Sequence, residues 1–187
     1  MAGSAESDRP YVELFVPALT NVSWSTEIVG QTLEALFVCL RPDGAHRLRP
    51  IHAPALRLGW RPDLQPADVI LGAVRRYGLR PLLLHSTSWR FEGARVFLTY
   101  VAAVAPPDEL DQYLVDEPVR RSDLARGDAM GGTPEIGLAQ VVEHAFRHLS
   151  WLVKDDAAVR EALSDWVGFL EAYEPEPFRA FGPGLPT

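Results

Sequence analysis

The sequence is poor in the residues on which several protein classes depend. It contains a single cysteine, Cys39, in 187 residues, which excludes an internal disulfide and any zinc centre built on several cysteines. Its apolar runs are far shorter than the roughly 20 residues of a membrane-spanning helix, so we expect no membrane partner. Acidic residues outnumber basic ones, 25 against 18, and the net charge is −7. This balance argues against general nucleic-acid binding, which needs a basic surface.

The remaining composition is that of a cytoplasmic globular protein. Hydrophobic residues make up 47% of the chain, and the mean hydropathy is −0.04, as is typical of a folded domain. We expect one domain over residues 11–173, between a polar, disordered tail at 1–10 and a proline-rich tail at 174–187. The polar start of the chain does not resemble a secretory signal. Cys39 lies among apolar residues, so we expect it in the core.

The clearest structural pattern covers residues 65–105. Pro66 begins a helical pattern of apolar residues, and Gly78 ends it at a position that favours a left-handed conformation. A strand pattern at 80–89 and another at 94–105 follow, joined by a predicted turn over Arg90–Gly93. Two strands joined this closely are expected to pair antiparallel, with the helix packed on one face of the sheet.

Further strands and loops are predicted around this stretch. The apolar run at 33–40 and the Asp43-Gly44 pair predict a strand that enters a hairpin. Residues 46–52 are expected to return as its partner, at an edge of the sheet because they include Pro50. Residues 53–64 are interpreted as a loop and 116–132 as a surface excursion. A weak alternation at 11–16 is typical of an edge strand.

Two more helices are predicted near the C-terminus. The first begins at Thr133 with Pro134 in its first turn. The second is capped by Asp155 or Asp156 and carries an apolar stripe that includes Trp166. The predicted fold class is therefore α+β: a mixed sheet sandwiched between helices, with an extra C-terminal helix.

The order of these elements resembles the middle of a Nudix-fold protein. The features shared are a helix that ends in Tyr-Gly-Leu at 77–79, a strand that ends in His85-Ser86, and a hairpin into a Val-Phe-Leu-Thr-Tyr strand. The family's box reads G-x5-E-x7-R-E-U-x-E-E-x-G-U, where U is aliphatic. Anchored on Gly78, its two metal-binding glutamates fall on Arg75 and Arg76. The resemblance thus implies a Nudix-like fold with a degenerate box.

The altered box changes the function that the resemblance implies. Mg²⁺ is held chiefly by carboxylates, and guanidinium groups repel it. We therefore expect a protein that has lost metal-dependent hydrolysis, uses no cofactor, and binds a nucleotide-like or other anionic small molecule or a protein partner. Arg75 and Arg76 can bind phosphate or carboxylate directly. Their alternative role is that of a solvated helix C-terminus.

A second hypothesis is that the protein is still a metal-dependent enzyme. It is a Nudix-type hydrolase of nucleoside diphosphate-linked substrates that holds Mg²⁺ or Mn²⁺ in an altered site. The acids available to such a site are Asp63, Asp68, Glu92 and Glu143. Convergence of three of them would favour this hypothesis, whereas Asp63 and Asp68 also suit the start of a helix.

Aromatic and histidine side chains supply the other candidate ligand-binding residues. Trp60 and Trp89 occupy loop and turn positions, where an indole can stack on a planar ligand, although core packing is the alternative. His85 belongs to a polar cluster at a strand end and can line a pocket. The sequence has no G-x-S-x-G motif, so a Ser–His hydrolase is not favoured.

Two observations bear on other functions. His144 and His148 are four residues apart on a predicted helix, the spacing of two metal ligands on one face; without a third ligand, such pairs are typical of a helix surface. A third hypothesis is an interaction module that dimerises through the C-terminal helix. Exposure of Trp166 and Phe169 would favour it.

Overall fold

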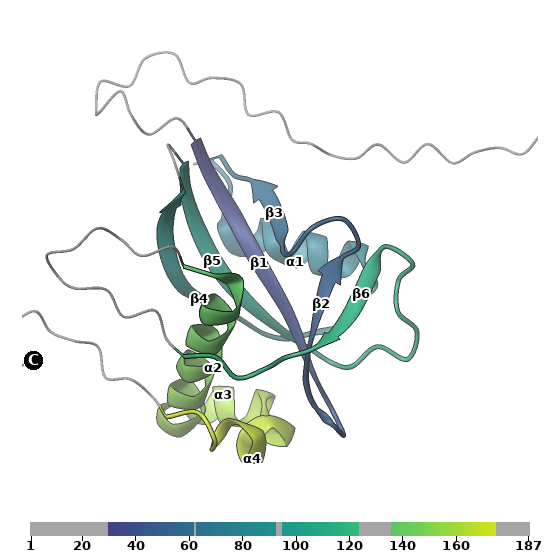
Figure 1. The fold of residues 1–187 in the computed structure, drawn as a ribbon, viewed down its shortest axis with the longest axis vertical. Helices are drawn as coiled ribbons and strands as arrows, with labels where there is room; N and C mark the ends of the chain where they lie inside the picture. Colours follow the sequence, from purple (N-terminus) through teal and green to yellow (C-terminus); the bar gives the residue numbers. More distant parts are fainter. Residues whose placement is uncertain (1–29, 62, 93–94, 124–135, 175–187) are drawn as a thin grey trace, which may run out of the picture.

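The computed structural model describes residues 30–61, 63–92, 95–123 and 136–174, shown as coloured ribbon in Figure 1. The predicted strand at 11–16, the helix start at Thr133 and the tail at 1–10 lie outside these residues. So does the predicted tail at 174–187, apart from its first residue. Among the described residues, no helix is long and apolar enough to cross a membrane.

The described chain forms one mixed sheet of six strands. The order is β4-β5-β1-β2-β6, and β3 pairs with the first half of β1. β1 and β5 are parallel over nine pairs, from Gly30↔Arg95 to Val38↔Ala103, and the other pairs are antiparallel. The strands are β1 (Gly30–Arg41), β2 (Gly44–Pro50), β3 (Leu56–Gly59), β4 (Pro81–Glu92), β5 (Arg95–Val104) and β6 (Leu114–Pro118).

Helices cover both faces of this sheet, as predicted for the fold class (Figure 1). On one face, α1 (Pro66–Arg76) packs Ile70 and Val74 against Phe37 of β1. On the other face, α2 (Leu138–Asp155) contributes Phe146 to the core that also contains Leu36 of β1. Alternate side chains of β1 therefore enter two separate cores. The C-terminal addition comprises α3 (Ala157–Ala162), a 3₁₀ turn η1 (Ser164–Trp166) and α4 (Val167–Leu170), next to α2.

Several local predictions are confirmed. The helix over 66–76 ends before Gly78, whose φ of 67° is left-handed. The hairpin turns before Gly44, which has a φ of 132° and pairs with Arg41. Asp156 caps the C-terminal helical region, because its side chain accepts hydrogen bonds from the backbone N–H groups of Ala158 and Val159. Cys39 is buried.

Four predictions about the strands are wrong. The turn after β4 was predicted over Arg90–Gly93, but Arg90 pairs with Phe97 inside the ladder, where its guanidinium reaches a buried carboxylate. Residues 56–59 of the predicted loop form β3 on β1. Residues 114–118 form β6, which covers β2 and so makes β2 an interior strand. Pro50 is tolerated there because it is the last residue of β2.

The predicted single C-terminal helix is also wrong, because the chain breaks after Ala162. The 3₁₀ turn that follows brings Trp166 onto Phe146, with ring centroids 6.2 Å apart. Trp166 is only 2% exposed, and Phe169 is half-buried against the same phenylalanine. The exposure that would favour dimerisation through Trp166 is therefore not found.

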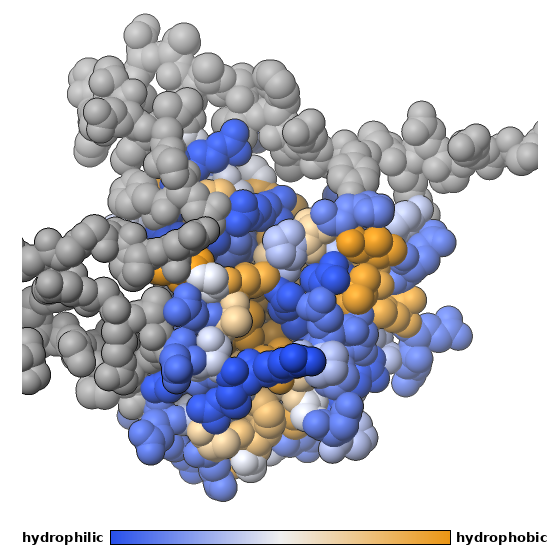
Figure 2. All heavy atoms as spheres, in the orientation of Figure 1, coloured by the Kyte–Doolittle hydropathy of each residue, from blue (hydrophilic) through white to orange (hydrophobic). Residues whose placement is uncertain are grey.

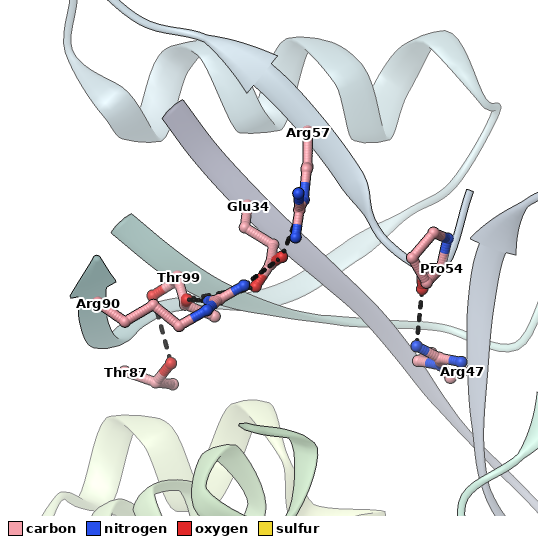
Figure 3. A network of polar contacts seen from close by, with 7 residues as sticks. All are labelled: Glu34, Arg47, Pro54, Arg57, Thr87, Arg90 and Thr99. Carbon is pink, nitrogen blue, oxygen red and sulfur yellow. Dashed lines mark hydrogen bonds and ion pairs between the residues drawn. The ribbon is translucent and has the colours of Figure 1, made fainter. Parts of the chain in front are cut away.

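A buried ion-pair network lies on the α2 side of the sheet (Figure 3). The side chain of Glu34 is 1% exposed. Arg90 donates to both of its oxygens, at 2.7 and 2.8 Å, and the Nε of Arg57 donates at 3.3 Å. Both guanidinium groups also lie over the ring of Phe97: that of Arg57 is 4.4 Å from the ring centroid, and that of Arg90 is 5.2 Å from it. This network joins β1, β3, β4 and β5 at the first half of β1.

The network predicts a large cost for removing Arg90. In Arg90→Met, the buried Glu34 carboxylate keeps only its longer hydrogen bonds, so the free energy of unfolding should fall by about 3 kcal/mol. Urea denaturation followed by circular dichroism measures this change. Arg61→Met is the matched control, because Arg61 forms an exposed pair with Asp63 at 3.1 Å and should cost less than about 1 kcal/mol. Equal costs for the two variants would contradict the expectation.

Candidate functional site

The two arginines predicted to bind an anion lie in the last turn of α1. Arg75 and Arg76 are exposed there. Within the described part of the chain, neither guanidinium has a hydrogen bond or an ion pair. Their position suits the negative end of the helix dipole. The same dipole opposes an anion that approaches this end of the helix.

Trp60 and the acids next to it have structural partners. The indole N–H of Trp60 donates to the carbonyl oxygen of Leu64 at 2.8 Å, and its half-buried ring packs on the α1 side of the core. Asp63 is exposed and pairs with Arg61, and Asp68 is exposed in the first turn of α1. These contacts order the loop that leads into α1.

Glu143, the remaining candidate metal ligand, lies on α2, on the opposite side of the sheet from Asp68. Its side chain is fully buried and bound by two arginines, with Arg121 at 3.0 and 3.1 Å and Arg147 at 3.2 Å. Arg121 also stacks on Tyr173. Glu143 therefore fastens the chain after β6 to α2, and the predicted acids do not converge. In the described ranges, no group of three or more His, Cys, Asp or Glu side chains is placed to hold a metal ion; the side chain of Glu92 lies outside them.

His85 and Trp89 both come from β4 but face opposite sides of the sheet. Trp89 is 64% exposed and pairs with Leu98, which packs on the α1 side. His85 faces α2, where its Nε2 lies 3.4 Å from Nδ1 of His148. The five predicted ligand-binding residues therefore do not surround one ligand: His85 is on the α2 side and Trp60 is on the α1 side.

A cluster of three histidines, His85, His144 and His148, lies between β4 and α2. The rings of His144 and His148 are 4.5 Å apart between centroids, as the spacing on one helix face predicts. Burial, and then the neighbouring imidazoles, lower the pKa of His148 to about 4. Burial also lowers the pKa of His85. All three rings are half-buried.

A hollow of about 370 Å³ lies between the chain that follows β6 and the first turns of α2. Figure 2 shows a face of the molecule in which hydrophobic atoms are visible among polar ones. Apolar side chains of the hollow come from Val119, Leu138 and Val142, and charged ones from Arg47, Arg120 and Glu117. The volume lies at the small end of the range for small-molecule sites, about 300–1,000 Å³.

The charged side of the hollow is positive. Glu117 accepts hydrogen bonds from Arg47 at 2.6 Å and from Arg49 at 2.9 Å. The Arg47 hydrogen bond, followed by that of Arg49, holds the pKa of Glu117 below its ordinary value, so this carboxylate is ionised. Arg120 is exposed and makes no ion pair with any described residue. Two guanidinium groups of the lining, those of Arg47 and Arg120, thus stand against the one carboxylate of Glu117, in a chain that is acidic as a whole.

Cys39, His46 and Asp116 form an arrangement that resembles a nucleophile with its base. Cys39 pairs with His46 across the β1–β2 ladder, and Nδ1 of His46 lies 2.6 Å from Asp116. However, the thiol is 0% exposed, and burial raises its pKa to about 11. A thiol in this state is neither ionised nor accessible at neutral pH. The group is therefore part of the core.

The burial of Cys39 predicts an inert thiol. In the native protein at pH 8, a thiol reagent such as dithionitrobenzoate should react at least tenfold more slowly than with the protein unfolded in urea, because the thiolate is scarce and shielded. Absorbance of the released thionitrobenzoate measures both rates. Native reactivity equal to that of the unfolded chain would overturn the assignment of Cys39 to the core.

The histidine cluster predicts a loss of stability in mild acid. His148 has a lower pKa in the folded state than its ordinary value of 6.5, so the unfolded chain takes up the proton first as the pH falls. The contribution is fully present above pH 6.5 and is lost on the way to pH 4. Between pH 6.5 and 5, the free energy of unfolding should fall by about 1–2 kcal/mol more in the wild type than in His148→Gln. Urea titrations at each pH measure the difference; parallel pH profiles would contradict it.

No protein-family model matches this chain, and no curated protein matches it. What the protein binds has to be inferred from its own residues, among them those that line the hollow beside α2.

Proposed function

We propose that this protein binds an anionic small molecule that has an apolar body, and that the hollow between α2 and the chain after β6 holds it. The observation that carries the proposal is the combination of apolar side chains and excess guanidinium charge around one cavity of about 370 Å³. Arg120, which makes no ion pair with any residue that the structure describes, supplies a donor for a carboxylate or phosphate group. Val119, Leu138 and Val142 supply apolar contact for the rest of the ligand.

The hollow suits an anion better than the end of α1 does. Arg75 and Arg76 lie at the C-terminus of a helix, where the dipole is negative. Leu138, at the hollow, is the first residue of α2, where the dipole is positive and favours an anion. We therefore assign ligand binding to Arg120, with Arg47 beside it, and give Arg75 and Arg76 the role of a solvated helix end.

The proposal agrees with the resemblance to Nudix proteins, in which Arg75 and Arg76 stand where metal-binding glutamates are expected. It gives the protein a binding role without metal-dependent hydrolysis. The hydrolase hypothesis requires a site made from other carboxylates, and Asp68 and Glu143 lie on opposite sides of the sheet. No observation in the described residues favours it over binding.

A ligand screen with matched arginine variants tests the proposal. Thermal shift should detect stabilisation by one or more small carboxylates or organic phosphates, since a ligand of the native state raises Tm by mass action. Arg120→Glu should weaken the best ligand about tenfold or more, because a charge-assisted hydrogen bond is lost and a repulsion is added. Ala139→Trp, which narrows the hollow without changing charge, should also weaken it. Isothermal titration calorimetry measures both effects.

Arg75→Glu is the matched control, because it makes the same charge change away from the hollow, and its affinity should equal that of the wild type. Weakening by Arg75→Glu and not by Arg120→Glu would move the site to α1. Stabilisation that appears only with Mg²⁺ or Mn²⁺ would favour the hydrolase instead. A screen in which no anion raises Tm would reject the proposal and favour a protein partner.

A further inference from the structure

The two edges of the sheet differ in length and in charge. β6 has 5 residues, of which Asp116 and Glu117 are acidic, and it ends at Pro118. Short length, charge and proline are features that keep an edge strand from pairing with another chain. β4 has 12 residues and forms the other edge (Figure 1). Among the described strands, none pairs with its outer side, so β4 presents backbone N–H and C=O groups to a further strand.

The outer edge of β4 is neutral in a chain whose net charge is −7. The segment from Pro81 to Trp89 includes no Asp, Glu, Lys or Arg. Arg90, which follows, directs its guanidinium to Glu34 inside the sheet. His85 faces α2, and burial holds its pKa below the ordinary value, so its ring is uncharged at neutral pH. Two acidic chains repel each other as wholes, so a contact between copies is favoured at a surface without charge, such as this edge.

Exposed tryptophans lie on both elements at this edge. Trp89 of β4 is 64% exposed, the largest fraction among the large hydrophobic residues that the structure describes. Trp151 of α2 is 39% exposed. It follows His144 and His148 on one side of the helix, the side on which His148 contacts His85 of β4. Tryptophan is enriched in the buried centres of protein interfaces, so the surroundings of the edge have the composition of an interface.

An irregularity in β4 defines how two copies can pair. The register of β4 on β5 shifts between Ser86 and Ser88, and Ser86 and Trp89 therefore share one face of the sheet, opposite Tyr100 and Leu98 of β5. A two-fold axis perpendicular to the sheet at this irregularity brings Ser86 of one copy opposite Trp89 of the other. A small and a large side chain then meet on the same face, as antiparallel pairing requires. Both copies contribute the same surface, which is the property of an isologous interface.

We propose that the protein forms a symmetric dimer in which the β4 strands of two copies pair antiparallel and join the two sheets into one. Trp89 of each copy packs on the other copy at Ser86. The interface lies at the opposite edge of the sheet from β6 and the hollow, because the strand order places β4 and β6 at its two ends. The proposal is therefore independent of ligand binding at Arg120.

Sedimentation equilibrium of the full-length chain tests the dimer. The wild type at about 0.1 mM should give a mass near twice 20.7 kDa. Ser86→Lys should weaken dimerisation about tenfold or more, because it puts a charge of the same sign on the neutral edge of each copy. Ser86→Glu should do the same, and an equimolar mixture of the two variants should recover the dimer. Gln65→Lys is the matched control, since Gln65 is exposed before α1 and its side chain makes no capping hydrogen bond, and it should dimerise like the wild type.

Disulfide formation tests the register. Ser86→Cys mixed with Trp89→Cys should give a covalent heterodimer on oxidation, because opposite residues of an antiparallel pair lie about 4.5–5.5 Å apart between Cα atoms, within the range of a disulfide. Each variant alone should give none, since its two new cysteines are offset along the strands and the native Cys39 is buried. Non-reducing electrophoresis measures the product.

Circular dichroism establishes that each variant folds, and if Ser86→Lys does not, the disulfide experiment still decides. A wild type that stays monomeric at about 0.1 mM would overturn the proposal and leave the edge to an extended segment of another protein. A dimer that Ser86→Lys leaves unchanged would place the interface elsewhere on the chain. A disulfide in either single variant alone would reject the symmetric pairing described here.

Discussion

The structure depends on one constraint: the side chains on both faces of β1 are buried. This strand pairs with β5 on one side and with β2 and β3 on the other, and eight consecutive residues of it are buried. Its alternating side chains form parts of two cores, one under α1 and one under α2. A shift of its register by one residue would exchange these two sets of side chains. It would also move Glu34 away from Arg57 and Arg90, which hold it from β3 and β4.

The same constraint explains which parts of the fold could be predicted. The helix α1, its glycine end and the β1–β2 hairpin depend on signals within a few residues, namely Pro66, Gly78 and the Asp43-Gly44 turn. By contrast, β6 is a strand because it pairs with β2, and the contact of Arg47 with Glu117 spans 70 positions. Nothing local in the charged segment 114–118 distinguishes it from a loop. The break after Ala162 likewise depends on the contact of Trp166 with Phe146.

The candidate functional groups divide in the same way, into those that a local sequence pattern indicates and those that only contacts between distant residues bring together. The pair His144 and His148 was visible because residues four apart share a helix face. The third member, His85, is 63 positions from His148, and no sequence signal connects them. The hollow could not be predicted either, because Arg47 of β2 and Leu138 of α2 meet only through the sheet. Arg75 and Arg76 belong to a local sequence motif, and a local motif carries no information about whether a cavity lies beside it.

The charge of the whole chain limits how an anion can bind to it. A net charge of −7 repels an anion at distances up to the screening length, about 10 Å at 0.1 M salt. Attraction by Arg47 and Arg120 acts only at short range, and Glu117 offsets part of it. Burial of apolar ligand surface, at about 25 cal/mol per Å², is not affected by this repulsion. A ligand with an apolar body therefore has an advantage over a simple inorganic anion, and the apolar side of the hollow matters for selection as much as its arginines do.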